Sequence, residues 1–448
     1  WKILGSVFRK TDRMSEALDA NQKSVVLVPE DAEAHYNLGN TLREMARLDE
    51  AETTYKQVIA LKPDFARAHY NLGLTINELG RLEEAETTYR QAILFEPNYA
   101  EVYSALGNTL QELGRLEEAE TTYRQAIALK PDYAEVHNNL GVTLQKLGKL
   151  KESEVSFRQA IAFKPDYAEV HNNLGVTLQK LGRLKEAEVS FKQAIAFKPD
   201  FAEFHSNLCI IFAINEDYDS SVVSAEKEKN IEPRSKAFMM LLSVLKSRQS
   251  HKKNGIVFSG LGESVFNMRL TSNPLILQRP VEPELVANLY DIDTIELDKQ
   301  NDPRFGNGKA TDWVLFENYR FKMENVKEDL INIIKKAVKS DIFIYDSFFN
   351  ILGAGSGSAP HDHLNSLDKT NGLNLYKQKY VLQYYLRVGD QNCDEPGIYK
   401  VYGPGEEILP SEGMVIIIPA ERMHSAVYGG ETDRVMIGIN FYALLGYA

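Results

Sequence analysis

The sequence predicts a protein of two unlike parts, a helical repeat array followed by a β-rich domain, so its fold class is multidomain α + β. A proline recurs every 34 residues through the first half of the chain. That period ends near Ile256, where short runs of Tyr, Phe, Val and Ile begin between Gly, Pro and Asp residues. A length of 448 residues with 44% apolar side chains suits large folded parts and excludes wholesale disorder or a small disulfide scaffold.

Composition also limits the partners and the compartment. A net charge of −12 argues against binding to nucleic acid. The longest apolar runs, such as Met414–Pro419, are too short for a membrane span of about 20 residues. The two cysteines, Cys209 and Cys393, match no metal or redox spacing and favour a reducing compartment, so we expect a cytoplasmic protein. Because the chain begins at Trp1 rather than at a methionine, a lost leader stays an open alternative.

The first half repeats one pattern of residue types. Glycine follows each proline by ten residues, alanine or serine by twenty-two and an aromatic residue by twenty-six, with changes in the last unit. Small residues let two helices approach closely, and proline ends the second helix of each unit. The prolines are Pro29, Pro63, Pro97, Pro131, Pro165, Pro199 and Pro233. This pattern resembles the tetratricopeptide family over residues 1–235, which implies a superhelix with a concave groove. Trp1–Gly5 falls in phase with His35–Gly39, so we expect a truncated first repeat and cannot count the repeats before it.

An asparagine ladder accompanies the repeat. The asparagine phase lies eight residues after the proline and comprises Asn37, Asn71, Asn139, Asn173 and Asn207. An amide both donates and accepts hydrogen bonds, so a row of amides can hold an extended peptide backbone. In the tetratricopeptide family this helix lines the groove, and the resemblance therefore implies a peptide or protein partner. The alternative is that asparagine merely suits this helix surface in recently duplicated repeats.

The repeat pattern weakens in the last unit, before the second part of the chain begins. The last unit has Cys209, Ser221 and Ala225 where the others have glycine, alanine and an aromatic residue, which is typical of a terminal repeat. We expect residues 236–254 to form a capping helix and linker, and residues 255–448 to form the second domain.

Short strands are expected throughout the second domain. They are Ile342–Leu352, Tyr380–Val388, Ile398–Tyr402, Met414–Ile418 and Arg434–Tyr442, and one helix is expected at Val326–Lys339. Regularly spaced short strands favour a β-sandwich or barrel.

Three histidines carry the chemical signal of this domain. Five of the nine histidines share one repeat phase and His251 lies in the linker, which leaves His361, His363 and His424. Residues two apart on a strand point the same way, so His361 and His363 can aim at one point, and His424 could close the same site from a neighbouring strand. Three imidazoles, or two with a carboxylate, make a metal site with open positions. Arg434 opens a strand ten residues beyond His424, where a guanidinium could bind a carboxylate through two hydrogen bonds.

The histidine pair, the distal histidine and the arginine together resemble the Fe(II)/2-oxoglutarate-dependent oxygenases over residues 255–448. The resemblance implies a double-stranded β-helix (a jelly-roll, cupin-like fold) with Fe(II), 2-oxoglutarate and O2 as cofactor and co-substrates. It further implies that His361 and His424 bind iron and that Arg434 anchors the distal carboxylate of 2-oxoglutarate. Tyr384 and Asn350 are candidates for further hydrogen bonds to the co-substrate.

The third ligand departs from the commonest pattern of that family. The pattern is His-x-Asp/Glu, but the third position here is His363. We favour His363 over Asp362, which would face the other way in a regular strand unless a bulge turns it, and Asp368 is a more distant option. A three-histidine site weakens the inference to 2-oxoglutarate. The spacing from Gly355 to the histidine pair also resembles the cupin motif.

The sequence therefore predicts a 2-oxoglutarate/Fe(II)-dependent dioxygenase, a hydroxylase acting on a peptide or protein recruited by the repeats. One alternative is a cupin-like three-histidine metalloenzyme acting on a small molecule. The other is a non-catalytic tetratricopeptide scaffold. The sequence leaves the substrate and the oligomeric state open.

Overall fold

The fold is described from a computed structural model of the chain. The structure describes residues 1–231, 236–253, 274–292, 294–296, 309–310, 315–318, 320–353, 356–370, 373–394, 396–402 and 405–444. The chain divides into two compact units, Trp1–Phe204 and His205–Ala448, each of which is treated by itself. No described helix is both long enough and apolar enough to cross a bilayer.

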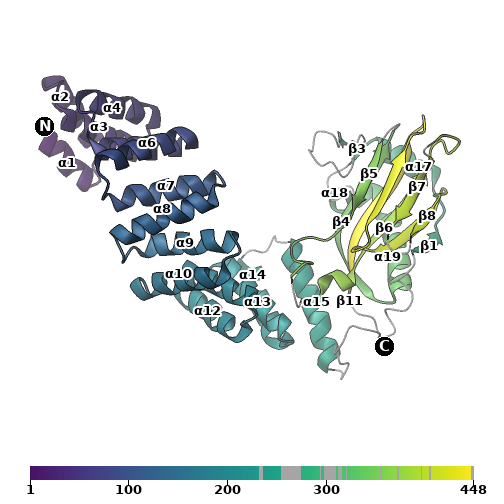
Figure 1. Cartoon of the computed structure of the whole chain (residues 1–448). Coiled ribbons are helices and arrows are strands. Elements are labelled where there is room, and N and C mark those ends of the chain that lie inside the picture. The colour runs from purple at the N-terminus through teal and green to yellow at the C-terminus, as the bar shows by residue number, and fades with distance from the viewer. Residues whose placement is uncertain are drawn as a thin grey trace. The chain divides into compact units, whose positions relative to one another are not determined.

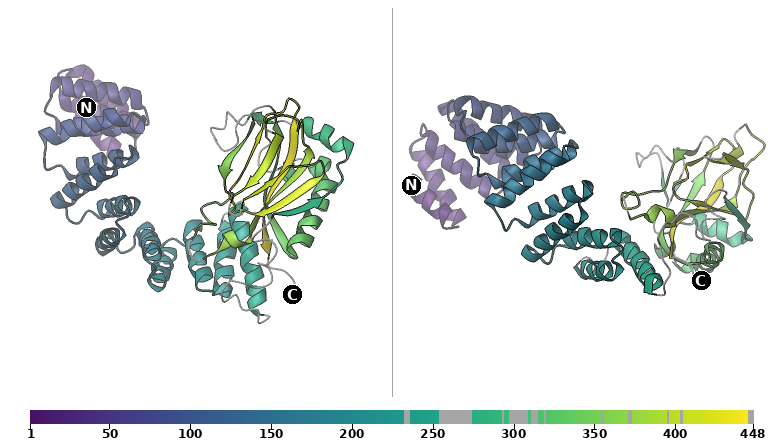
Figure 2. Two further views of the ribbon diagram at one scale, coloured as in Figure 1. Left: turned by 45° about the vertical axis from the view of Figure 1, so that its right-hand side comes forward. Right: turned by 60° about the horizontal axis from the view of Figure 1, so that its bottom comes forward.

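The first unit is a stack of antiparallel helix pairs in chain order (Figures 1 and 2). In each complete pair a first helix of 13 residues precedes a second helix of 14 residues. The helices are α1 Lys2–Lys10, α2 Met14–Leu27, α3 Ala32–Glu44, α4 Leu48–Leu61, α5 Ala66–Glu78, α6 Leu82–Phe95, α7 Ala100–Glu112, α8 Leu116–Leu129, α9 Ala134–Lys146, α10 Leu150–Phe163, α11 Ala168–Lys180 and α12 Leu184–Phe197.

Two glycine phases make this stack possible. Gly114 between the helices has φ +76°, a left-handed conformation that glycine adopts without steric cost. Gly107 within the first helix lies so close to the ring of Tyr123 that a Cβ atom there would be 2.5 Å from the ring. The repeating glycine therefore marks the place where one helix packs directly on an aromatic side chain.

The histidines of the repeat phase are structural. The Nε2 atom of His69 lies 2.8 Å from the carbonyl oxygen of Pro63, and His137 and His171 make the same contact with the prolines of their own units. Their rings also stack on the aromatic residue that ends the second helix, as His137 does on Phe163 at 5.5 Å. These histidines hold the inter-repeat loops.

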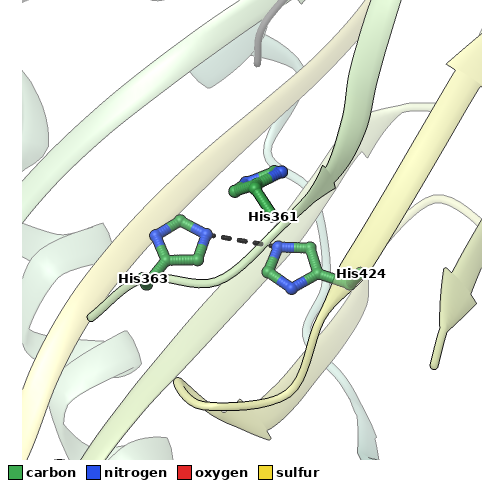
Figure 3. Close-up of side chains that lie close together, drawn as sticks. All are labelled: His361, His363 and His424. Carbon is green, nitrogen blue, oxygen red and sulfur yellow. Dashed lines mark hydrogen bonds between the residues drawn. The ribbon is translucent and has the colours of Figure 1, made fainter. Parts of the chain in front are cut away.

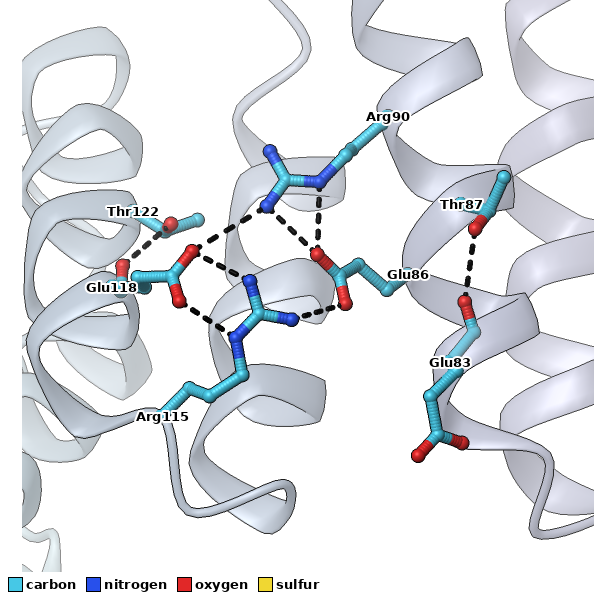
Figure 4. Close-up of polar contacts among 7 residues, drawn as sticks. All are labelled: Glu83, Glu86, Thr87, Arg90, Arg115, Glu118 and Thr122. Atoms are coloured by element: carbon cyan, nitrogen blue, oxygen red, sulfur yellow. Dashed lines mark hydrogen bonds and ion pairs between the residues drawn. The ribbon is translucent and has the colours of Figure 1, made fainter.

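Ion pairs join the second helices of successive units (Figure 4). Arg115 bonds both to Glu118 on its own helix and, at 2.6 Å, to Glu86 on the preceding second helix. Arg90 reaches the same two carboxylates. Exposed pairs of this kind are worth less than about 1 kcal/mol each, so they fix the register of neighbouring helices more than they stabilise the unit.

The second unit begins with three helices, α13 Ala202–Ile214, α14 Tyr218–Ile231 and α15 Lys236–Lys253. Apolar residues of these helices, including Leu241 and Leu245, form one core with Leu373, Leu375 and Tyr442 of the β region. Buried Arg248 of α15 donates to the carbonyl oxygen of Leu373 and to Oε1 of Gln378. The chain thus divides within α13, after Phe204, whereas the predicted junction follows the capping helix.

The β region consists of two antiparallel sheets. The seven-stranded sheet has the order β1-β9-β6-β11-β4-β3-β2, and the four-stranded sheet has the order β5-β10-β7-β8. From β4 to β11 the chain passes back and forth between them, since β4, β6, β9 and β11 belong to the first and β5, β7, β8 and β10 to the second. The strands are β1 Leu275–Gln278, β2 Ile295–Glu296, β3 Lys309–Ala310, β4 Asp341–Leu352, β5 Ser356–His361, β6 Lys379–Arg387, β7 Pro396–Val401, β8 Glu406–Ile408, β9 Met414–Pro419, β10 His424–Tyr428 and β11 Arg434–Leu444.

The large sheet is buried on both faces. Helices α17 Pro283–Tyr290, α18 Leu315–Asn318 and α19 Arg320–Val338 cover one face in a core that contains Phe349, Tyr384 and Ile437. A second core that contains Tyr385, Tyr399 and Tyr428 draws on strands of both sheets. The five strands expected from the sequence match β4, β6, β7, β9 and β11 within two residues at each end, and the expected helix is the C-terminal part of α19.

Candidate metal centre

Three histidines from two segments that are far apart in the sequence meet in the β region (Figure 3). His361 ends β5, His424 begins β10 opposite it, and His363 lies two residues beyond the end of β5. One ligand nitrogen from each ring lies within 4.8 Å of the other two. The main-chain N–H of His363 donates to the carbonyl oxygen of Ala420, which holds that segment against the end of β9.

The environment of His424 suits a metal ligand. Its Nδ1 atom lies 3.1 Å from the carbonyl oxygen of Arg422 and donates to it, so that the lone pair is on Nε2, the atom that faces His363. Burial, helped by the nearby His361, lowers the pKa of His424 to about 4. The imidazole is therefore neutral at physiological pH, as a metal ligand must be.

The ring separations fit an ion bound to nitrogen. The Nε2 atoms of His363 and His424 are 3.2 Å apart. Two nitrogens at about 2.1 Å from one ion and at roughly a right angle to each other would be about 3 Å apart. A set of three imidazole nitrogens suits Fe(II), Zn(II) or Cu(II) better than Mg(II) or Ca(II), which prefer oxygen. The residues present thus fit a transition metal.

The carboxylate alternatives to His363 are engaged elsewhere. Asp362 accepts the main-chain N–H of Leu364 at 3.0 Å and lies 3.7 Å from Lys369. Asp368 forms a fully buried ion pair with Lys379 at 2.8 Å. Of the three options for the third ligand, the structure brings only His363 to the other two histidines.

Arg434 is buried, and its guanidinium already donates hydrogen bonds to main-chain oxygens. It donates to the main-chain carbonyl oxygens of Val388, Gly397 and Pro396 at 3.2, 2.6 and 2.5 Å. Its side chain faces the second core, 4.6 Å from the centre of the Tyr428 ring. A surface ion pair is thereby excluded for this arginine, and its role in holding a carboxylate stays a prediction.

The structure corrects the position expected for Tyr384. Its side chain lies in the core under the helices, where its hydroxyl donates to the carbonyl oxygen of Pro280 and accepts from Arg279. The next residue, Tyr385, points to the opposite face, toward the core that both sheets share. Asn350 is buried opposite Met436, a residue of that shared core. Tyr384 therefore points away from the face that carries the candidate site.

Sequence reasoning missed Tyr399. Its ring lies 5.3 Å from the ring of His424, and it is 1% exposed. Its hydroxyl has no hydrogen-bond partner among the described residues, and burial raises its pKa well above the usual value, so that it stays protonated. A buried hydroxyl without a partner costs about 1–3 kcal/mol, which is a feature of sites that a ligand completes. The alternating pattern of β7 could have placed it on the inner face, but not beside a histidine.

The asparagine ladder is used largely within the array. Asn71 donates to Oδ1 of Asn40 at 2.6 Å and to the hydroxyl of Tyr36. Asn139 and Asn173 donate to Oδ1 of Asn108 and Asn138 on the preceding unit, at 2.9 and 3.1 Å. Asn37 and Asn207 are half-buried on α3 and α13. The amide donors of three of the five ladder residues thus join neighbouring repeats, which corrects the expectation that these amides are free for a peptide.

Comparison with known proteins bears on the first part of the chain. The family model for the C-terminal domain of cilia and flagella-associated protein 70, a tetratricopeptide-repeat domain, matches residues 1–206. The first part of this chain is a tetratricopeptide-type repeat array. That match spans less than half of the 448 residues and does not reach the histidines.

Several solved structures are similar to part of this chain at low identity. The structure of pilF from Pseudomonas aeruginosa is 20% identical, with a TM-score of 0.43 over 47% of this chain and 96% of its own. YrrB, whose structure is described as a tetratricopeptide-repeat protein with an unusual peptide-binding site, is 24% identical, with a TM-score of 0.37 over 41% of this chain and 94% of its own. The search of curated proteins found no match.

Proposed function

We propose that this protein is a repeat-array interaction protein whose β region binds a catalytic transition metal through His361, His363 and His424. This proposal rests on the convergence of three imidazoles, whose ligand atoms lie within 4.8 Å of one another. A cluster of metal-ligating residues is where the search for an active site begins.

We propose further that the metal is Fe(II) and that the protein is a 2-oxoglutarate-dependent dioxygenase with a double-stranded β-helix. The alternation of β4 to β11 between two facing sheets is the strand arrangement of a jelly roll, which supports this fold. The positions of the histidines at the end of β5 and the start of β10, and of Arg434 at the start of β11, agree with the resemblance seen in the sequence.

Each residue has a distinct part in this proposal. Fe(II) with 2-oxoglutarate and O2 would supply the oxidising power for hydroxylation, and the protein would bind and orient the reactants. The three imidazoles leave coordination positions open, and the hydrogen bond from His424 to Arg422 fixes which nitrogen faces the metal. Tyr399, which keeps its proton, would donate a hydrogen bond to a carboxylate of the co-substrate and takes the part expected of Tyr384.

The repeat array would recruit a peptide or protein substrate. Because three ladder asparagines donate to neighbouring repeats, peptide contacts would use their remaining carbonyl oxygens and the half-buried tyrosines beside them, such as Tyr36 and Tyr70. The proposal of a peptide or protein substrate rests on the presence of both domains in one chain, which is an argument by association.

A second function is favoured by one observation. Three main-chain carbonyl oxygens already accept from Arg434. If that arginine serves only to join β11 to the end of β6 and the start of β7, no arginine is left to anchor the co-substrate. The protein would then be a non-catalytic tetratricopeptide scaffold, or a cupin-like three-histidine enzyme acting on a small molecule.

Metal content and 2-oxoglutarate turnover together test these functions. Purified protein would be titrated with Fe(II) without oxygen, and succinate formation would then be measured with 2-oxoglutarate and O2. We expect one metal per chain, lost in His361→Ala and His424→Ala but kept in the control His171→Ala, whose histidine holds a repeat loop. If the protein binds metal but does not turn over 2-oxoglutarate, the cupin-like enzyme is favoured. If it binds no metal, the non-catalytic scaffold is the remaining function.

Paired tyrosine variants test the co-substrate contact. Tyr399→Phe should raise the KM for 2-oxoglutarate about tenfold, the value of one hydrogen bond to a charged group, without changing metal content. Tyr384→Phe should leave that KM unchanged because its hydroxyl faces the helix-covered core. An equal effect of both variants would contradict the assignment.

A further inference from the structure

The second helices of the first unit carry a row of exposed residues that no part of the proposed function uses. The row consists of the second and sixth residues of helices α4, α6, α8, α10 and α12, which lie one turn apart on one face. We call it the outer strip. It comprises Asp49 and Thr53 on α4, Glu83 and Thr87 on α6, Glu117 and Thr121 on α8, Lys151 and Val155 on α10, and Lys185 and Val189 on α12, all of them exposed.

The outer strip changes character between α8 and α10. On α4, α6 and α8 the second residue is acidic and the sixth is threonine, whereas on α10 and α12 the second is lysine and the sixth is valine. Val155 and Val189 are 60% and 59% exposed. Valine is a poor helix former compared with the straight-chain residues common on exposed helix faces, so packing within this unit does not explain its presence here.

The charges of the outer strip are not used internally. Among the described residues, none of the five charged side chains of the strip forms an ion pair, although the same helices carry many others (Figure 4). Glu83 illustrates the contrast, because it lies apart from the network that joins Glu86 to Arg115 in Figure 4. The strip is therefore a surface with an acidic half and a basic, partly apolar half.

We propose that the outer strip is a self-association surface on which a second copy of this chain docks with its repeats running in the opposite order. A two-fold axis parallel to the helices and midway between α8 and α10 would place α10 on α8 of the second copy and α12 on its α6. Lys151 then faces Glu117 of the second copy, and Lys185 faces its Glu83. The symmetry doubles both contacts to four ion pairs.

The apolar residues match under the same rotation. Val155 faces Thr121 of the second copy and Val189 faces its Thr87. The hydroxyls of both threonines donate to main-chain carbonyl oxygens of their own helices, at 3.0 Å, which leaves the methyl groups as the outer surface. Each lysine–carboxylate pair is thus accompanied by a valine–methyl contact four residues along the helix.

Complementarity within one chain is the reason to choose a second copy over another partner. Both charge signs occupy the same position in successive second helices, so the reversed array matches the acidic α6 and α8 and the basic α10 and α12 at once. A partner of one charge sign would engage only half of the strip. Because the contacts are exposed ion pairs, the association should weaken as salt rises.

Charge reversal on the full chain tests this proposal. One variant, Lys151→Glu with Lys185→Glu, makes the whole strip acidic, and a second, Glu83→Lys with Glu117→Lys, makes most of it basic. The matched control is Lys146→Glu with Lys180→Glu, which makes the same charge change at exposed lysines that end the first helices of the same two repeats. Molar mass would be measured by light scattering and sedimentation at low and high salt.

We expect the wild type and the control to dimerise at low salt and to dissociate at high salt. Each reversal should weaken its own dimerisation at least about tenfold, because four favourable pairs become repulsive. An equimolar mixture of the two reversed variants should dimerise again. A wild type that stays monomeric at low salt, or a dimer that neither reversal weakens, would overturn the proposal. The outcome does not depend on the metal centre.

Discussion

Removing one partner of the buried ion pair between Lys379 and Asp368 should cost more stability than a change at an exposed ion pair. Lys379 and Asp368 lie 2.8 Å apart with side chains 3% and 0% exposed. Lys379→Met keeps the length of the side chain but leaves the carboxylate without its cation. Breaking such a pair costs about 3–5 kcal/mol. Asp368 still accepts from the hydroxyl of Tyr442 at 2.6 Å and from the N–H of Asn365 at 2.9 Å, so we expect the lower end, about 3 kcal/mol.

Hydrogen exchange followed by mass spectrometry suits this measurement because it separates β6 and β11 from the repeats. The control is Lys400→Met, whose partner Glu407 is 3.3 Å away and mostly exposed, and it should cost less than about 1 kcal/mol. The double variant Lys379→Met with Asp368→Asn should recover part of the loss because no buried charge remains. If Lys379→Met lowers the opening free energy of β6 no more than the control does, the argument from burial is refuted.

Three further outcomes are expected. Burial raises the pKa of Asp346 from 3.8 to about 6, so the folded state favours the protonated acid. The free energy of unfolding should therefore fall by about 3 kcal/mol as the pH rises from 4 to above 6. Asp346→Asn should flatten that dependence in denaturant titrations of the second unit. Gly141→Ala would bring a Cβ atom within 2.6 Å of the Phe157 ring and should destabilise the repeat array by about 1–3 kcal/mol, measured by circular dichroism during urea unfolding. Arg248→Met should leave Oε1 of Gln378 without its donor and raise the exchange rate of the segment after His363, whereas the same change at an exposed arginine should not.

The repeat array was predictable because its information is local. A period of 34 residues fixes helix, turn and helix in each unit, and each unit touches mainly its neighbours. The asparagine ladder shows the limit of prediction from the repeat pattern. An amide at this phase can bond either to a neighbouring repeat or to a peptide, and only the structure reveals that Asn71 donates to Asn40 of the preceding repeat.

The histidines were predictable from their scarcity and spacing, but the tyrosines around them were not. Alternation along β6 assigns Tyr384 and Tyr385 to opposite faces. Alternation does not show which face carries the site, because the large sheet is buried on both sides and β6 has apolar residues on both faces. The faces differ only in what covers them, and the covering helices come from residues far away in the sequence.

The same limit explains the helix that the sequence assigns to the end of the array. An amphipathic pattern shows that α15 buries one face, but not which partner covers it. In the structure that partner includes Leu373, Leu375 and Tyr442 of the β region, and buried Arg248 bonds to the segment between His363 and β6. A β region separated at residue 255, where the period ends, would expose this core and release that segment. A fragment that begins at α13 keeps both, so the metal centre should be studied together with the last three helices.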